Sequence, residues 1–257
     1  IVFISHKMRE VLHVSDRVTI LRAGSAICTL EAKQTDGREL TNLMIGRELA
    51  DSDYEKVESE QESVIELHSV CYNKSSKHNG LNDVSLTVRK GEILGIAGVD
   101  GNGQSQLAQI VTGVICAETG HVVLKGCSVS RFTAADFIRR SVSHIPEDRN
   151  RMGLVGDMSV EENLLLKSTQ MCEFCSAGGW RLKKKAMRAY TEQMRKKYDI
   201  RCQSPEQEIR SLSGGNQQKV ILARELEAKP DLLVAVHPTR GPDIGATRYV
   251  RDAMIAA

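Results

Sequence analysis

A glycine-rich loop at residues 98–105 has the residue types and spacing of a phosphate-binding site. It reads Gly-Val-Asp-Gly-Asn-Gly-Gln-Ser and fits the pattern G-x-x-x-x-G-K-[ST] at every defining position except the lysine, which is Gln104. Glycines let backbone N–H groups point at phosphate oxygens, and the hydroxyl of Ser105 can bind Mg²⁺. The loop predicts nucleotide binding, although Gln104 offers only a neutral hydrogen bond where lysine would offer a charged one. By itself, the loop also fits an ordinary glycine-rich turn of an α/β fold.

A second candidate phosphate contact lies at residues 212–219, which read Leu-Ser-Gly-Gly-Asn-Gln-Gln-Lys and precede an apparent helix from Val220 to Glu227. Ser213 and the two glycines stand where this helix begins. They offer a hydroxyl, exposed backbone donors and the positive end of the helix dipole to a terminal phosphate. The alternative is an ordinary capped helix start.

The segment 212–219 resembles the signature motif of ABC ATPases, with the Asn-Gln-Gln-Lys ending typical of the two-domain ATP-binding subunits of bacterial simple-sugar and nucleoside ABC importers. Residues 143–155 resemble the Q-loop of the sugar importers. Residues 5–10 resemble the switch-histidine segment, residues 16–24 the segment that follows it, and residues 238–246 the D-loop region. The resemblance covers nearly the whole chain. It implies a P-loop NTPase fold of the ABC ATPase type, with ATP and Mg²⁺ as cofactors.

Position by position, the resemblance implies roles for individual residues. Tyr72 stands where the family places an aromatic ring that stacks on adenine, although alone it would be an ordinary sheet residue. In the family, the Q-loop couples the nucleotide site to the membrane subunit; here it contains Glu147 in place of glutamine, followed by Asp148 and Arg149. The D-loop residue would be Asp243. The implied nucleotide-binding residues are Tyr72, Gly98, Asp100, Gly101, Asn102, Gly103, Gln104, Ser105 (which would also bind the metal) and Gln106. The implied catalytic residues are His6 (as switch histidine), Ser213, Gly214, Gly215 and Gln217.

The chain departs from the family pattern after the apolar run 232–236. The family places Asp and then Glu at the end of this strand, the first to hold Mg²⁺ through its water shell and the second to polarise the attacking water. Here His237 follows Val236, and both carboxylates are missing. A histidine could act as a base, but it would bring positive charge when protonated and has no Mg²⁺ partner beside it. Without the lysine and the two carboxylates, we expect the domain's own site to be non-hydrolytic.

The resemblance also implies composite sites, each formed by the P-loop of one domain and the signature motif of the other. The signature motif of this chain would then serve the ATP of a missing first nucleotide-binding domain, together with that domain's own switch residue, His6. The full subunit would be an ATPase that drives import of a sugar or nucleoside, and the chain alone would be inactive. Its partners would be membrane permease subunits and, through them, an extracytoplasmic substrate-binding protein. The subunit would lie at the cytoplasmic face of the membrane.

Composition shifts divide the chain into three parts. Residues 1–50 are interpreted as the C-terminal remnant of a first nucleotide-binding domain, the polar and acidic residues 51–62 as a linker, and residues 63–257 as a second, C-terminally truncated domain. The apolar residues 1–4 predict a buried strand, and residues 247–257 predict an unfinished helix. Both ends therefore look cut.

The second domain is predicted to be α/β, with an antiparallel β portion near residues 64–97 and a helical subdomain near residues 158–212. The apolar residues 93–97 predict a strand at the centre of a sheet that leads into the glycine-rich loop and a helix from Ser105. Ser159 has the sequence signature of a helix start. Strand, glycine loop and helix in this order form a phosphate-binding arrangement.

The composition narrows the function classes only slightly. A formal charge of +2 favours neither nucleic acid nor an acidic substrate, and the basic residues between 181 and 197 have few interleaved aromatics, which favours a solvated helix face. Seven cysteines favour reduced thiols; Cys172 and Cys175 could be half of a zinc site or a redox dithiol, but no second pair has a matching spacing. No apolar run approaches the length of about 18 residues that a membrane span requires.

Two other classes of function remain open. One is a cytosolic tandem ABC ATPase that acts on ribosomes or DNA, against which the coupling loop around Glu147 and the ending at residues 216–219 both argue. The other is a regulatory nucleotide-binding module without turnover, which the missing lysine and carboxylates suggest.

Overall fold

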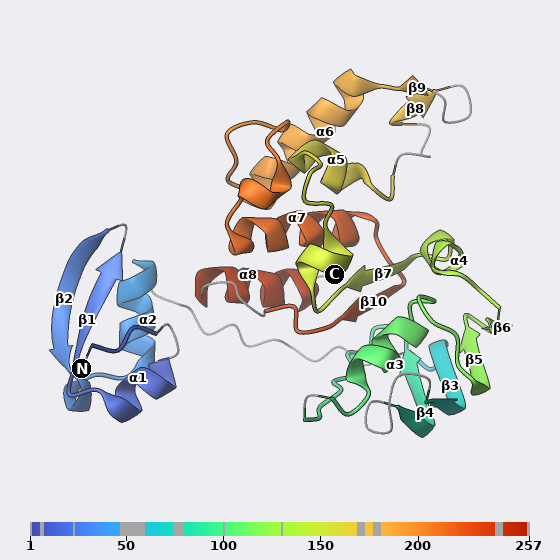
Figure 1. Cartoon of the computed structure of the whole chain (residues 1–257), viewed down its shortest axis with the longest axis horizontal. Helices are drawn as coiled ribbons and strands as arrows, with labels where there is room; N and C mark the ends of the chain where they lie inside the picture. Colours follow the sequence, from blue (N-terminus) through green and yellow to red (C-terminus); the bar gives the residue numbers. More distant parts are fainter. Residues whose placement is uncertain are drawn as a thin grey trace.

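The computed structural model describes residues 2–5, 8–22, 24–46, 60–73, 80–99, 101–129, 131–168, 173–176, 181–239 and 244–255. Within them the chain forms a small N-terminal α/β unit, an antiparallel sheet, a two-stranded parallel sheet and a group of helices (Figure 1). None of the helices in these segments is both long and apolar enough to cross a membrane. Three predicted site residues, His6, Asp100 and Asp243, lie outside the described residues.

The N-terminal unit packs two helices against a β-hairpin. The hairpin is antiparallel, with Val18 opposite Leu30, and its buried face packs on Val11 and Leu40 from the helices. Asp36 caps the second helix by accepting hydrogen bonds from two backbone N–H groups. The elements are α1 (Met8–Val14), β1 (Arg17–Arg22), β2 (Ser25–Glu31), a 3₁₀ turn (Ala32–Gln34) and α2 (Gly37–Ile45).

The buried strand predicted at residues 1–4 is wrong for the residues that are described. Val2 and Ile4 are each 90% exposed, and residues 2–5 have no regular secondary structure. In the described part of the chain, β1 and β2 pair only with each other. An apolar run becomes a strand only where a neighbour completes its backbone hydrogen bonds.

The antiparallel sheet has the strand order β4-β3-β5-β6, which confirms the β portion expected after residue 64. Its inner face carries Ile65, Leu67 and Leu124, each at most 2% exposed. The helix α3 contributes Ile110 to the same core, so the sheet fixes the position of this helix. The elements are β3 (Ser63–Tyr72), β4 (Leu81–Arg89), α3 (Gln104–Ile110), β5 (Thr119–Leu124) and β6 (Cys127–Ser128).

The central strand predicted at residues 93–97 is not formed. Ile93 is 77% exposed and Ile96 is 53% exposed. The parallel sheet consists of β7 (Val142–Ile145) and β10 (Leu232–Ala235), and neither strand pairs with this segment in the described residues. The glycine-rich loop is therefore positioned by α3 and by the end of the antiparallel sheet, and not by a strand of its own.

The helices gather around α7, which lies between the parallel sheet and the helical subdomain (Figure 1). Four consecutive residues of α7, Val220 to Ala223, are fully buried. The predicted helix start at Ser159 is confirmed by a capping box with Glu162. The elements are α4 (Ala134–Arg139), α5 (Val160–Leu165), the hairpin β8 (Cys175–Ser176) and β9 (Arg181–Leu182), α6 (Lys184–Lys197), α7 (Gly214–Glu227) and α8 (Ile244–Ile255).

The expectation that residues 158–212 are mostly helical is confirmed in part, because residues 199–208 form an irregular connection and a hairpin interrupts the helices. Basic residues of α6 lie beside acidic ones: Arg188 pairs with Glu206 at 2.6 Å, and Lys197 pairs with Glu227 at 2.6 Å. These pairs agree with a solvated helix face. Of the predicted cysteine pair, Cys175 is buried in β8, and Cys172 lies outside the described residues.

Asn163 in α5 is fully buried and satisfies the backbone of the preceding loop. Its Nδ2 donates to the carbonyls of Val155 and Ser159, each at 3.0 Å, and its Oδ1 accepts from the N–H of Val155 at 2.9 Å. We expect Asn163→Ala to lower the free energy of unfolding by about 2–3 kcal/mol, because these buried groups lose their partner. Urea denaturation measures the change.

The control for this prediction is Asn150→Ala, because the side chain of Asn150 is exposed. This control should change the free energy of unfolding by less than about 0.5 kcal/mol. A loss for Asn163→Ala no larger than that of the control would contradict the role assigned to the buried amide.

Candidate functional site

The glycine-rich loop closes against the end of the antiparallel sheet. Gly103 has φ +93°, and a Cβ there would lie 2.8 Å from both the carbonyl oxygen of Gly80 and Leu81 Cδ2. Only glycine therefore fits this position. Leu81 pairs with Tyr72 across β3 and β4. The predicted adenine-stacking residue thus lies at the same end of the sheet as the loop.

Gln104, which replaces the expected lysine, folds back over the loop. Its Nε2 donates to the carbonyl of Val99 at 3.0 Å, and a Cβ at Gly98 would collide with this amide. The neutral side chain therefore bonds to the loop's own backbone. Of the other predicted nucleotide-binding residues, Gly101 and Asn102 lie in the loop and Gln106 lies in the first turn of α3.

Ser105 connects the glycine-rich loop to the predicted coupling loop. Its hydroxyl donates to Oε2 of Glu147 at 3.0 Å, although the two residues are 42 positions apart. Glu147 lies two residues after the end of β7, and Pro146 between them is buried. A hydroxyl and a carboxylate at this distance are oxygen ligands of the kind that Mg²⁺ prefers. Within the described residues, no group of three or more His, Cys, Asp or Glu side chains is placed to hold a metal ion.

The predicted coupling loop continues into a short π-helical turn, Arg149–Gly153, that packs on α7. Asp148 caps the turn by accepting from the backbone N–H groups of Asn150 and Arg151 at 3.0 and 3.1 Å. A Cβ on Gly153 would lie 2.8 Å from Cδ1 of Ile221 in α7. The turn can approach the helix this closely because residue 153 has no side chain.

The signature segment forms the N-terminus of α7, as predicted. Ser213 occupies the N-cap position with extended backbone angles and remains exposed, and its hydroxyl accepts from Nδ2 of Asn216 at 3.0 Å. Gly214 and Gly215 are the first two residues of the helix. A Cβ on Gly214 would collide with the guanidinium of Arg149, which covers the start of the helix. The serine hydroxyl and the helix N-terminus are the parts that can contact a phosphate.

Gln217, a predicted catalytic residue, points into the protein. It is 8% exposed. Its Oε1 accepts from Nε of Arg149 at 3.2 Å, and its Nε2 donates to the carbonyl of Ile209 at 3.2 Å. The amide of Gln217 therefore links the start of α7 both to the 149–153 turn and to the chain just before the helix.

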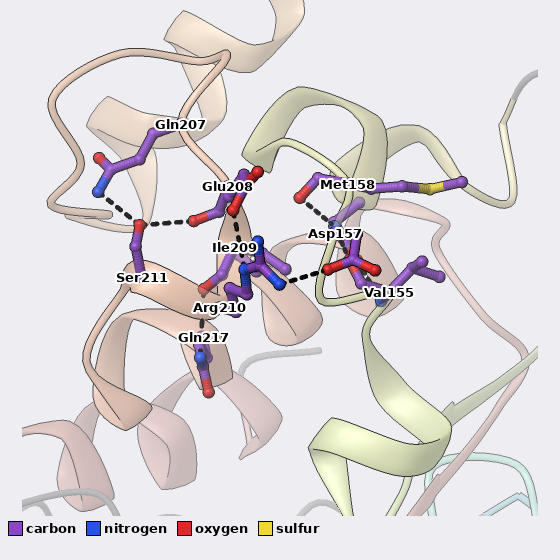
Figure 2. Close-up of polar contacts among 10 residues, drawn as sticks. Val155, Asp157, Met158, Gln207, Glu208, Ile209, Arg210, Ser211 and Gln217 are labelled. Carbon is purple, nitrogen blue, oxygen red and sulfur yellow. Dashed lines mark hydrogen bonds and ion pairs between the residues drawn. The ribbon is translucent and has the colours of Figure 1, made fainter.

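The chain before the signature motif is fastened to the loop that precedes α5 (Figure 2). Arg210 pairs with Asp157 at 2.7 Å, and the N–H of Ile209 donates to the carbonyl of Met158 at 3.0 Å. Ser211 accepts from Nε2 of Gln207 at 2.8 Å. Sequence reasoning did not identify this contact, because its partners are about 50 residues apart and neither segment carries a recognisable motif.

A buried ionic cluster lies in the C-terminal half of α7. The sequence did not predict it. Glu225 is fully buried and accepts from Arg224 Nε at 2.9 Å and from Lys167 Nζ at 2.6 Å. Burial by itself would raise the pKa of Glu225, but the two cations outweigh it and the pKa is lowered. Arg224 also donates to the carbonyl of Gly153 at 2.8 Å, which ties the 149–153 turn to the same cluster.

The strand β10 ends where the family pattern requires two carboxylates. The N–H of Val236 donates to the carbonyl of Ile145 at 2.9 Å, so the strand extends one residue along β7. His237 then turns outward, exposed and with a positive φ of 45°. Its strained backbone marks the point where the chain leaves the sheet. The residues that approach one another around the site are thus Ser105 with Glu147, and Arg149 with Gly214 and Gln217.

A family model and individual relatives point to the same family of proteins. The family described as ABC transporter matches residues 81–240. The chain is 38% identical to the guanosine import ATP-binding protein NupO of Bacillus subtilis, over 94% of this chain and 47% of that protein. It is 40% identical to the glucose import ATP-binding protein TsgD13 of Haloferax volcanii, over 99% of this chain and 46% of that protein. The chain spans about half the length of the curated relatives it matches.

Solved structures share the fold. The dimeric ATP-binding cassette MJ0796 bound to ADP and Pi aligns with a TM-score of 0.61 at 20% identity, over 74% of this chain and 81% of that one. A nucleotide-free ATP-binding cassette from an ABC transporter aligns with a TM-score of 0.60 at 20% identity, over 76% of each chain. The predicted fold class is therefore confirmed.

The environment of His144 on β7 predicts that the free energy of unfolding depends on pH. Burial and the positive charge of Lys167 lower the pKa of His144 to about 4, whereas the negative charge of Glu225 acts in the opposite direction. Its Nε2 is buried without a hydrogen-bond partner among the described residues. Because the unfolded chain binds this proton at a higher pH, stability is lost as pH falls from about 6.5 towards 4. We expect a loss of about 2 kcal/mol between pH 7 and pH 5.

Urea denaturation at both pH values checks this prediction. His144→Gln should remove most of the pH dependence, whereas the control His121→Gln, on an exposed position of β5, should retain it. An equal slope in the His144 variant and the unsubstituted chain would refute the assignment.

Proposed function

Because the chain belongs to the ABC transporter family, we propose that it is a portion of the ATP-binding subunit of an importer for nucleosides or simple sugars. The substrate class comes from the names of its relatives, which include import proteins for guanosine, glucose and nucleosides. The full subunit would hydrolyse ATP to drive transport. It would work at the cytoplasmic face of the membrane, with permease subunits and an extracytoplasmic substrate-binding protein as partners.

The observation that carries this proposal is the contrast between two phosphate-contacting elements. The signature segment keeps its exposed serine and two glycines at the start of α7. The glycine-rich loop has lost its lysine to Gln104, and His237 stands where carboxylates should follow β10. We infer that this signature segment serves ATP held by another domain, and that the chain's own loop holds nucleotide without hydrolysing it.

The residues around the glycine-rich loop suit Mg²⁺ and a nucleotide. Gly103 leaves room where a Cβ would meet the sheet, and the oxygens of Ser105 and Glu147 are already within hydrogen-bonding distance of each other. These two oxygens would hold Mg²⁺, which would supply positive charge against the phosphates. Tyr72 would contact the base from the end of β3. What the site lacks is the charged partner for the terminal phosphate and the carboxylate that orients water.

In the site shared with the other domain, this chain would contribute binding and orientation. The N–H groups at the start of α7 and the hydroxyl of Ser213 would donate to the terminal phosphate as negative charge develops on it. His6, as the switch histidine of the preceding domain, and Asp243, in the D-loop, are proposed to lie at the same shared site. The helix orients these donors before the reaction takes place.

The missing charges at the chain's own loop also favour a second function, a regulatory nucleotide-binding module without turnover. It differs from the first proposal in the behaviour of the complete subunit bound to its permease. Nucleotide binding without phosphate release by that complex would support the regulatory module. Phosphate release coupled to transport would support the importer ATPase.

The two phosphate-contacting elements should respond differently to substitution. In the full-length subunit with its permease, Gly214→Asp should lower the ATPase rate more than about 100-fold, because it places a carboxylate at a phosphate-binding helix N-terminus. Ser105→Ala should lower the rate less than about fivefold. Gly156→Asp is the control, since a Cβ there meets only an ordinary contact. Equal losses from the first two variants would rule out this division of roles.

The chain by itself should bind MgATP and release no phosphate above background. Fluorescence of a mant-labelled ATP measures binding, and a phosphate-release assay measures turnover. Ser105→Ala should weaken binding about fivefold, because one oxygen ligand of the metal is lost. Phosphate release that disappears in Ser105→Ala would show instead that the chain's own site is hydrolytic.

A further inference from the structure

The start of α6 and the strand before it carry a cluster of positive charge that lies outside the sites described above. Residues 174–191 contain five lysine and arginine residues and no Asp or Glu. Figure 1 shows β9 and the start of α6 at the outer end of the helical group, away from α8. All five cations are exposed, and together with Leu182 they are called the basic patch: Arg181, Lys183, Lys184, Lys185 and Arg188.

The basic patch is built on a fixed framework. The N–H of Lys183 donates to the carbonyl of Phe174 at 2.8 Å, and Leu182 lies opposite Cys175 in the β8–β9 hairpin. Phe174 is 3% exposed and meets the ring of Tyr190 in α6 edge-on, with ring centroids 5.1 Å apart. The hairpin is therefore fastened to α6, and the cations of the two elements keep their relative positions.

Carboxylates on flanking elements offset only part of this charge. Arg188 pairs with Glu206 at 2.6 Å, and Glu173 stands at the start of the hairpin. Burial and the charge of Glu206 raise the pKa of Glu161, whereas Arg188 and Lys184 lower it, so these cations lie near both carboxylates. Five cations face three carboxylates, and the positive end of the α6 dipole adds to the excess. The basic patch is therefore positive.

Leu182 gives the basic patch an apolar component. It is 46% exposed and stands between Arg181 and Lys183. At a membrane surface such an arrangement places the apolar side chain at the boundary of headgroups and acyl chains, while the cations meet anionic headgroups. Duplex DNA would offer the same phosphate charge but no layer that takes up an apolar side chain. The composition of the patch therefore favours a lipid surface.

We propose that the basic patch binds the anionic lipid headgroups of a membrane surface. Each lysine or arginine close to such a surface strengthens binding about fivefold, and the attraction is screened over about 10 Å at 0.1 M salt. Because the five cations lie within eight consecutive residues, they act on the same area of membrane. The inference takes the membrane location from the proposed function, but the binding itself needs neither nucleotide nor permease.

Co-sedimentation of the chain with lipid vesicles tests the proposal. The chain should bind vesicles of phosphatidylcholine that contain about a third of phosphatidylglycerol, in about 0.1 M NaCl. Vesicles of phosphatidylcholine alone should bind it at least about tenfold more weakly, and about 1 M NaCl should release it from the anionic vesicles. Equal binding to both kinds of vesicle, or binding to neither, would overturn the proposal.

Substitutions locate the binding surface. Lys184→Gln combined with Lys185→Gln should lower the partition coefficient on anionic vesicles about 25-fold, since two cations are lost at about fivefold each. The matched control is Lys33→Gln combined with Lys196→Gln, which removes the same charge from exposed positions outside the patch. Lys196 lies in the last turn of α6. The control should change the coefficient less than about twofold. Equal losses from both pairs would show attraction by net charge alone and would overturn the proposal.

A second pair of substitutions guards against misfolding. Arg181→Gln combined with Lys183→Gln, on the hairpin side of the patch, should also lower the partition coefficient about 25-fold. The thermal midpoint of each variant, measured by far-UV circular dichroism, should stay within about 2 °C of the unsubstituted chain. Unchanged vesicle binding in either folded pair contradicts the proposal.

Leu182→Gln separates a lipid surface from a nucleic acid. This variant should bind anionic vesicles about threefold more weakly than the unsubstituted chain, because the apolar contact is lost. Retention of the chain on a DNA duplex at the same salt concentration, without retention on anionic vesicles, would overturn the proposal in favour of nucleic acid. The ATPase comparison of Gly214→Asp with Ser105→Ala tests the proposed function separately.

Discussion

The close packing of the 149–153 turn on α7 is the contact on which the arrangement of the site depends. It exists because Gly153 lacks a side chain that would collide with Ile221, and because Arg224 provides a buried donor to the Gly153 carbonyl. The charge of Arg224 is tolerated only because Glu225 lies beside it in the same apolar surroundings. The helix whose N-terminus is proposed to contact phosphate is thus held by a buried charge pair in its C-terminal half, and the turn determines where its first residues lie.

Sequence patterns predicted those elements whose formation depends on residues close together in the chain. The helix start at Ser159 follows from a serine with a glutamate three residues later, and both members of that capping box are present. The position of Gly214 at the start of α7 follows similarly from a serine and two glycines before an apolar stripe. In these places the chain folds locally, so the pattern of residue types is sufficient.

Predictions failed where a segment depends on a distant neighbour. Residues 93–97 have the composition of a central strand, yet Ile93 and Ile96 are exposed and the segment has no strand partner in the described part of the chain. The buried pair of Arg224 and Glu225 was missed for the opposite reason, because adjacent charges in a helix ordinarily face solvent. Neither outcome is encoded in residue type or spacing, since both depend on which surfaces meet after folding.

The two elements that are proposed to contact phosphate also differ in how far their binding depends on particular side chains. Binding by a helix N-terminus comes from backbone N–H groups and the helix dipole, which persist while the helix is intact. Hydrolysis requires particular charged side chains, and in the proposed function Gln104 and His237 stand where two of them would be needed. In the proposed function, a domain whose own site does not turn over therefore still supports the site of another domain.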